Sequence, residues 1–227
     1  LHGFLDLLSR RLTGLFVKAG AKYRPTRNPR LADEVLAASV GLGTGHLVSR
    51  LQTPRQALLY HAGTLSSRTR SAERLRGMLC EETGSEVRIV EFAGSWVRLP
   101  SSEQSRLAGP GSAGSHMILG DSMVAGQQVW DPAARFHISL GPMSYASFCT
   151  LLPGTPLHTR LVELTRLHVG VEVDFALNPI LEAAEVPGLC LPVGEQGAAR
   201  LGWTSWLTSP RPRRAAAADA LLGPAPA

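Results

Sequence analysis

Hydrophobic and polar residues alternate most clearly in the middle of the chain. Phe136, Ile138 and Leu140 are separated by polar residues, which is the period of a strand with one buried face. Residues 123–130 precede a turn and are expected to supply the second strand of a hairpin. Gly141-Pro142 is expected to stop the strand. This segment predicts a structural scaffold.

A helical period marks the beginning of the chain. Apolar residues recur every three or four positions from Phe4 to Ala19, and Pro25 ends the pattern. The same pattern is compatible with a helix on a membrane surface and with a helix packed on a core. The core-packing interpretation is preferred.

Further elements follow from apolar spacing and capping residues. Ser71 is suited to cap a helix over 72–83, with Gly84 after its end. His168 continues a leucine stripe and should be a buried structural histidine. Residues 86–92 are apolar on both faces, which indicates a bulge or a strand covered on both sides. Other helices are expected over 31–40, 54–65, 145–152, 157–168 and 180–185, and another strand over 172–177.

Together these elements predict an α+β fold. A helical N-terminal part should be followed by short antiparallel strands or hairpins with interspersed helices. We divide the chain into a mainly helical part (1–84), a mixed α/β part (85–207) and a disordered Pro/Ala/Arg tail (208–227). The start inside a helical pattern suggests that an N-terminal section is missing.

Composition and charge narrow the function only modestly. Charged residues make up 18% of the chain and the net charge is +5, which favours an anionic partner weakly and a solvated basic surface more strongly. Three widely separated cysteines fit neither a disulfide framework nor a CxxC metal pair, which indicates a reducing cytosol. No apolar run approaches the length of a membrane span.

Several residues are candidates for contacts with a partner protein. Arg70 could contact an acidic partner, although a loop arginine is usually solvated, and Leu167 lies among charged residues on its helix. Ser101 and Arg106 lie in a Gly/Ser/Pro-rich segment (101–115), which we expect to be an exposed, mobile loop.

Two tryptophans near the end of the chain receive different predictions. Trp203 follows Gly202, which would allow close backbone packing and place that indole in the core. Trp206 precedes a tail without a packing pattern, so we expect it at the edge of the fold, as an interface anchor.

Local signatures of catalysis are not found in the sequence. HExxH, GxSxG, a Walker loop and carboxylate clusters were sought, and the seven histidines are scattered. Gly41 to Gly45 is glycine-rich but has neither the spacing nor the lysine of a P-loop. We predict no enzyme activity, no metal and no cofactor. A nucleic-acid- or anion-binding module is the alternative, but the few aromatic residues are not interleaved with arginine.

Five segments carry a set of motifs in a fixed order along the chain: Phe4-Leu5-Asp6 to Leu15-Phe16 with Lys22-Tyr23-Arg24, Leu59-Tyr60-His61-Ala62-Gly63 with Arg70-Ser71-Ala72-Glu73, Phe92 to Pro100, Trp130-Asp131 to Met143, and Arg200 to Leu207. With these motifs in family order, the chain resembles the TssG (ImpH/VasB) family of type VI secretion baseplate proteins. One departure is Arg10, where the family pattern has histidine.

The resemblance implies a structural role and a set of partners. It implies a cytoplasmic wedge made of this subunit with two copies of TssF, joined by TssE. The wedge would surround the spike hub and dock the TssK adaptor at a baseplate attached to the inner membrane, so that sheath and tube assemble for effector delivery. It implies neither nucleic-acid binding nor direct membrane insertion.

Overall fold

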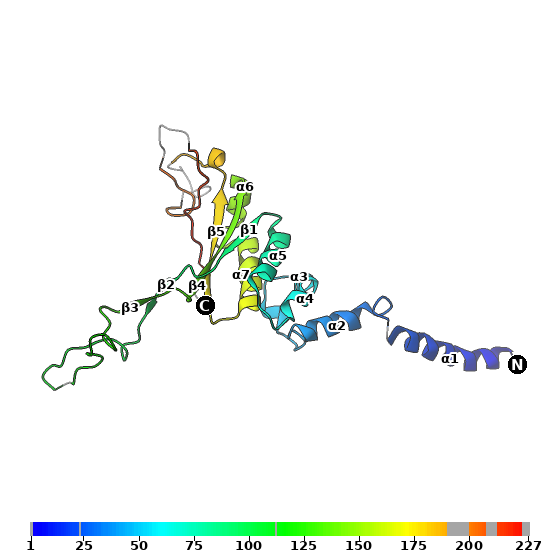
Figure 1. Cartoon of the computed structure of the whole chain (residues 1–227). Helices are drawn as coiled ribbons and strands as arrows, with labels where there is room; N and C mark the ends of the chain where they lie inside the picture. The colour runs from blue at the N-terminus through cyan, green and yellow to red at the C-terminus, as the bar shows by residue number, and fades with distance from the viewer. Residues whose placement is uncertain (1, 23, 112, 190–199, 208–212, 224–227) are drawn as a thin grey trace. The chain divides into compact units, whose positions relative to one another are not determined.

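A computed structural model describes residues 2–22, 24–111, 113–189, 200–207 and 213–223, and Figure 1 shows its elements. The chain divides into two compact units, Leu1–Thr69 and Arg70–Ala227. The helix over 72–83 therefore belongs to the unit that contains the sheets, whereas we grouped it with the helical part from the sequence. The fold class is α+β, as predicted.

The first unit is helical. Asn28 caps α2, because its side chain accepts a hydrogen bond from the Leu31 amide and Pro29 opens the helix. The expected helix over 54–65 is interrupted at buried His61. The elements of this unit are α1 (His2–Lys22), α2 (Pro29–Ser39), the 3₁₀ turn η1 (Val48–Arg50), α3 (Arg55–Tyr60) and α4 (Ala62–Leu65).

Helix α1 forms as predicted, but the first unit does not bury its apolar face. None of its described residues is buried, and its large apolar side chains are all exposed. The periodicity was a correct signal for a helix, but it does not say which molecule covers the apolar face.

The second unit is built on a three-stranded sheet with the order β1-β4-β5 (Figure 1). Strand β4 (Arg135–Met143) is central and pairs antiparallel with β1 (Val87–Val90) and parallel with β5 (Asp174–Leu181). Alternate β4 residues are buried, as the sequence predicted. A separate two-stranded ribbon consists of β2 (Ser95–Arg98) and β3 (Gln128–Asp131).

Three predictions about the strands are wrong. Residues 128–131 pair with β2 rather than with β4, because β4 is occupied on both sides by β1 and β5. Strand β4 also continues through Gly141-Pro142 to Met143, with a register shift that accommodates the proline. Strand β1 buries only Val87, so it is covered on one face.

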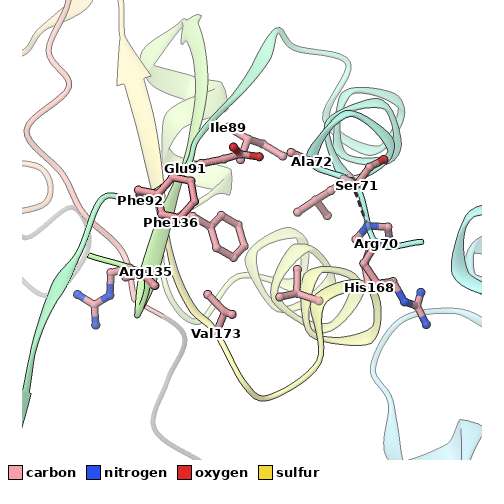
Figure 2. A pocket seen from close by; sticks show the side chains of 13 residues that line it. Arg70, Ser71, Ala72, Ile89, Glu91, Phe92, Arg135, Phe136, His168 and Val173 are labelled. Carbon is pink, nitrogen blue, oxygen red and sulfur yellow. Dashed lines mark hydrogen bonds between the residues drawn. The ribbon is translucent and has the colours of Figure 1, made fainter. Parts of the chain in front are cut away.

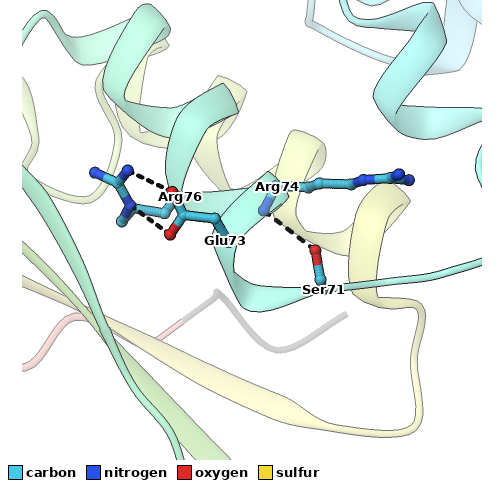
Figure 3. A network of polar contacts seen from close by, with 4 residues as sticks. All are labelled: Ser71, Glu73, Arg74 and Arg76. Carbon is cyan, nitrogen blue, oxygen red and sulfur yellow. Dashed lines mark hydrogen bonds and ion pairs between the residues drawn. The ribbon is translucent and has the colours of Figure 1, made fainter.

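Helix α5 (Ala72–Thr83) has the predicted caps. The Ser71 hydroxyl accepts a hydrogen bond from the Arg74 amide (Figure 3). Gly84 adopts φ 63° after the last turn. On its exposed side, Glu73 accepts hydrogen bonds from the Arg76 guanidinium, which lowers the pKa of the carboxyl and raises that of the guanidinium.

Two further helices connect the parallel strands β4 and β5. Helix α7 (Pro156–Val169) buries Leu161 and Leu164 of the predicted leucine stripe together with His168. Its arginines form ion pairs, Arg160 with Glu82 of α5 at 2.9 Å and Arg166 with Asp174 of β5 at 3.1 Å. The shorter helix α6 (Tyr145–Thr150) contacts β5 and α7.

The secondary structure after Pro179 differs from the prediction. Ile180 and Leu181 belong to β5, and only the 3₁₀ turn η2 (Ala183–Glu185) remains of the helix expected over 180–185. The tail was expected to be disordered. Its residues 213–223 instead form bridges to β5, with Ala217, Ala220 and Leu222 buried. Residues 208–212 and 224–227 lie outside the described part of the chain.

The positions of the two tryptophans are the reverse of those predicted. Trp206 is only 8% exposed, and its ring lies edge-on to Phe148 with centroids 5.7 Å apart. Trp203 is half-buried beside the Arg200 guanidinium. Gly202 has φ 79° and open space around it, so this glycine permits a turn rather than a close approach.

Trp206→Ala should therefore destabilise the protein by about 3–5 kcal/mol, because it empties a large aromatic site. Trp203→Ala is the matched control and should cost less than about 1.5 kcal/mol, since its indole lies near the surface. Denaturant unfolding of both variants checks this. A larger loss for Trp203→Ala would contradict the observed packing.

Candidate partner-binding surfaces

The ribbon of β2 and β3 carries an exposed pair of tryptophans. Trp96 and Trp130 face each other across the two strands, with ring centroids 5.6 Å apart and planes at 67°. They remain 63% and 49% exposed. A cross-strand aromatic pair stabilises a two-stranded ribbon, and it leaves one side of each indole available to another molecule.

Gly94 fixes the position of the Trp130 ring. Its φ is 71°, and a Cβ built on it would lie 2.3 Å from Cζ2 of Trp130. The Gly94 amide also donates a hydrogen bond to the Arg135 carbonyl at 3.3 Å, which joins the ribbon to the start of β4. The indole is therefore held in place before any partner arrives.

The loop between these strands covers residues 99–127 and includes the segment 101–115, most of whose described residues are exposed as predicted. It contains its own hydrogen bonds. Arg106 and Ser115 exchange two backbone hydrogen bonds of 3.0 and 3.1 Å. The Val124 amide donates to the Ser105 hydroxyl at 2.9 Å. These bonds could not be predicted from the sequence, because they join polar residues far apart in a segment without periodicity.

This loop exposes several large apolar side chains. Leu119 is 87% exposed, next to the backbone turn in which the Ile118 carbonyl accepts three amide hydrogen bonds. An apolar group of this size outside the core marks an interaction surface. We call this set the loop cluster; it consists of Leu107, Met117, Ile118, Leu119 and Met123.

Helix α1 presents a second apolar surface, in the first unit. Phe4, Leu8, Leu12 and Leu15 recur at spacings of four, four and three, so they lie on one face. All four are exposed in the described chain. Leu7 is equally apolar but lies off this face.

The predicted contact residues fall into three places. Ser101 and Arg106 are exposed in the loop that joins β2 to β3, the two strands that carry the tryptophan pair. Trp206 is buried, which removes it from the surface; the sequence did not show that Phe148 would cover it.

Arg70 and Leu167 each precede a residue of a contacting pair, Ser71 and His168. His168 Nε2 lies 3.3 Å from the Ser71 carbonyl oxygen, which can only accept, so Nε2 carries the proton. Burial lowers the pKa of His168 by more than the hydrogen bond to Ser71 raises it, and the charges of Arg70 and Arg74 lower it further. The histidine is therefore neutral at pH 7.

A cavity of about 390 Å³ lies beside His168 (Figure 2). Figure 2 shows Phe92, Phe136 and Val173 around it, while the Arg135 side chain extends away. These three side chains are apolar, and the polar residues that line the same cavity are Arg70, Ser71, Glu91, Arg135 and His168. Of these, His168 Nε2 is already hydrogen bonded to the Ser71 carbonyl. Within the described residues, no group of three or more His, Cys, Asp or Glu side chains could hold a metal ion. Among the same described residues, no helix is both long and apolar enough to span a bilayer.

Together these features define an α+β protein that exposes large apolar side chains on a helix and on a two-stranded ribbon with its loop. Residues 1–208 match the model of the family described as "Type VI secretion, TssG", so the chain belongs to the TssG family. This family is a structural component of the type VI secretion baseplate.

Two solved structures share the fold. A chain of the TssK-TssF-TssG baseplate subcomplex, determined by cryo-electron microscopy, matches with a TM-score of 0.75 at 19% identity, over 96% of this chain and 91% of that one. A chain of a type VI baseplate complex matches with a TM-score of 0.61 at 19% identity, over 99% of this chain and 62% of that one. No curated protein matches the chain.

Gly94→Ala should disturb the ribbon without unfolding the sheet, because its Cβ would collide with Trp130. Far-ultraviolet circular dichroism should lose the exciton signal of the coupled indoles. Gly126→Ala is the control, since Gly126 also has a positive φ but nothing within 4 Å. An equal loss in both variants would show that backbone strain, not the contact with Trp130, is responsible.

Stability should depend on pH through His168. Its folded pKa lies below 6.5, so the unfolded state takes up the proton first as pH falls. The stabilisation is complete above pH 6.5 and is lost below it. His168→Gln keeps a donor for Ser71 and should reduce the loss of unfolding free energy between about pH 7 and 5. Identical pH profiles for the variant and the wild-type protein would contradict this.

Proposed function

We propose that this chain is a structural connector in a type VI secretion baseplate, working in the cytoplasm and not as an enzyme. The observation that carries the proposal is the exposure of large apolar side chains on two elements, α1 and the ribbon with its loop cluster. Such surfaces are unfavourable in water and are typical of permanent interfaces. Membership of the TssG family supports assigning them to baseplate partners.

Helix α1 is the proposed contact for TssF. The helix has 21 residues, and at 1.5 Å per residue it is about 30 Å long. A single amphipathic helix is marginal in water, and most of its stability comes from packing its apolar face. A helical or grooved surface on TssF would provide that packing. TssF occurs with TssG in the solved subcomplex.

The ribbon and its loop are the proposed contact for the TssK adaptor. The tryptophan pair is amphipathic, and the loop cluster adds flexible methionines and leucines on the loop that joins the two strands. Ser101 and Arg106 lie on the same loop and would form part of its polar rim. Arg70 and Leu167 remain candidate contacts elsewhere in the second unit.

The wider assembly is proposed from the family resemblance. It consists of a wedge with two TssF copies, joined by TssE, arranged around the spike hub at a membrane-docked baseplate, from which sheath and tube grow. A nucleic-acid- or anion-binding module is the alternative, supported only by the net charge of +5.

The role of α1 can be tested with two neighbouring leucines. Leu8→Glu should weaken TssF association at least tenfold, because it places a charge in the apolar face, and a factor of ten corresponds to about 1.4 kcal/mol. Leu7→Glu, off that face, should bind as the wild-type chain does. Co-purification and titration measure both. Equal binding by the two variants would remove α1 from the interface.

The role of the loop is tested separately. Leu119→Asp should reduce TssK binding at least tenfold while TssF binding is retained, since hot-spot truncations cost about 2 kcal/mol or more. Val171→Asp is the control, because Val171 is equally exposed but lies in the turn between α7 and β5. Unchanged TssK binding by Leu119→Asp would exclude the loop cluster.

A further inference from the structure

The end of the chain is hydrogen bonded to the outer edge of β5. The Leu177 amide donates to the Leu222 carbonyl and the Leu222 amide donates back, both at 2.8 Å. Leu181 and Ala217 exchange the same two bonds at 2.9 Å. These are two antiparallel bridges, and they place residues 217–222 alongside the strand that would otherwise be the edge of the sheet (Figure 1).

The pairing contains a bulge that determines which side chains face inward. The interval 177–181 on β5 is opposite the longer interval 217–222 on the tail, so the tail carries one extra residue. In a regular strand, residues 217 and 222 would point to opposite faces. The extra residue brings both onto the side of Leu177 and Leu181, which are buried. Ala217 and Leu222 are buried as a result.

Pro179 separates the two bonding positions that the tail occupies on this edge. It lies midway between Leu177 and Leu181, where the next amide facing the tail would be expected, and proline has no such donor. The Asn178 side chain partly replaces it, donating to the Ala218 carbonyl at 3.1 Å. The tail thus takes both amides that the edge offers on either side of the proline.

The side chains of the tail fit this position closely. Leu222 is 1% exposed, whereas its neighbour Leu221 is 50% exposed, so only one of the two leucines is buried. Ala217 and Ala220, which are buried, have the smallest chiral side chains. The Arg213–Asp219 ion pair, at 3.3 Å, lies on the exposed side and links residues within the tail.

We propose that the outer edge of β5 is a strand-accepting site and that residues 213–223 are its occupant. The site takes an extended peptide with alanine at the narrow positions and one seated leucine. By filling it, the tail stops this edge from pairing with the edge of a second copy, which is the hazard of an open strand.

Hydrogen exchange of the Leu177 and Leu181 amides tests the proposal on the full chain, alone or in complex. Truncation after residue 212 should accelerate both by at least about tenfold, since they lose their acceptors. A synthetic peptide of residues 213–223 should restore the protection. The Ile138 amide, on the central strand, reports whether the rest of the sheet stays folded.

Leu222→Ser in the full chain is the second variant, and Leu221→Ser is its matched control. The first should accelerate exchange at Leu177, and the second should not. Truncated chains that protect these amides only by concentration-dependent dimerisation would also support the proposal. Slow exchange in a monomeric truncated chain would overturn it, as would equal effects of the two serine variants.

Discussion

The parallel pairing of β4 with β5 is the constraint on which the second unit depends. Parallel neighbours cannot be joined by a tight turn, so the chain must cross over between Met143 and Asp174. It does so through α6 and α7, and α7 then buries Leu161 and Leu164. The same crossover brings Arg166 over the Phe175 ring and within 3.1 Å of Asp174. Strand pairing, helix packing and ion pairs therefore follow from one topological choice.

Local elements could be predicted from the sequence because their signals are local. Ser71 and Gly84 bound α5 as expected, and the alternation along β4 identified its buried face. Strand partners could not be predicted in this way. The segment at 128–131 is adjacent to β4 in sequence, yet it pairs with β2, since β1 and β5 already saturate β4. Pairing depends on competition between segments that are far apart in the sequence. A short stretch of sequence therefore does not determine which strands pair.

The candidate surfaces show the same limit. The amphipathic pattern of α1 predicted the helix, but periodicity is identical whether the covering molecule is this chain or another one. Trp96 and Trp130 were each visible in the sequence, but their pairing depends on the register of the ribbon and on Gly94. Trp206 was misplaced because its partner, Phe148, comes from a helix far away in the sequence.

A preformed ribbon is energetically favourable for partner binding. Tryptophan carries roughly 200 Å² or more of surface, so covering the exposed halves of both indoles would remove roughly 200 Å² from water. At about 25 cal/mol per Å², that contributes roughly 5 kcal/mol before the costs of association. The cost of ordering these side chains is already reduced, because Trp130 is fixed against Gly94 and Trp96 against Trp130. The ribbon thus combines exposure with order, and a partner would gain most of the burial energy without first having to immobilise the indoles.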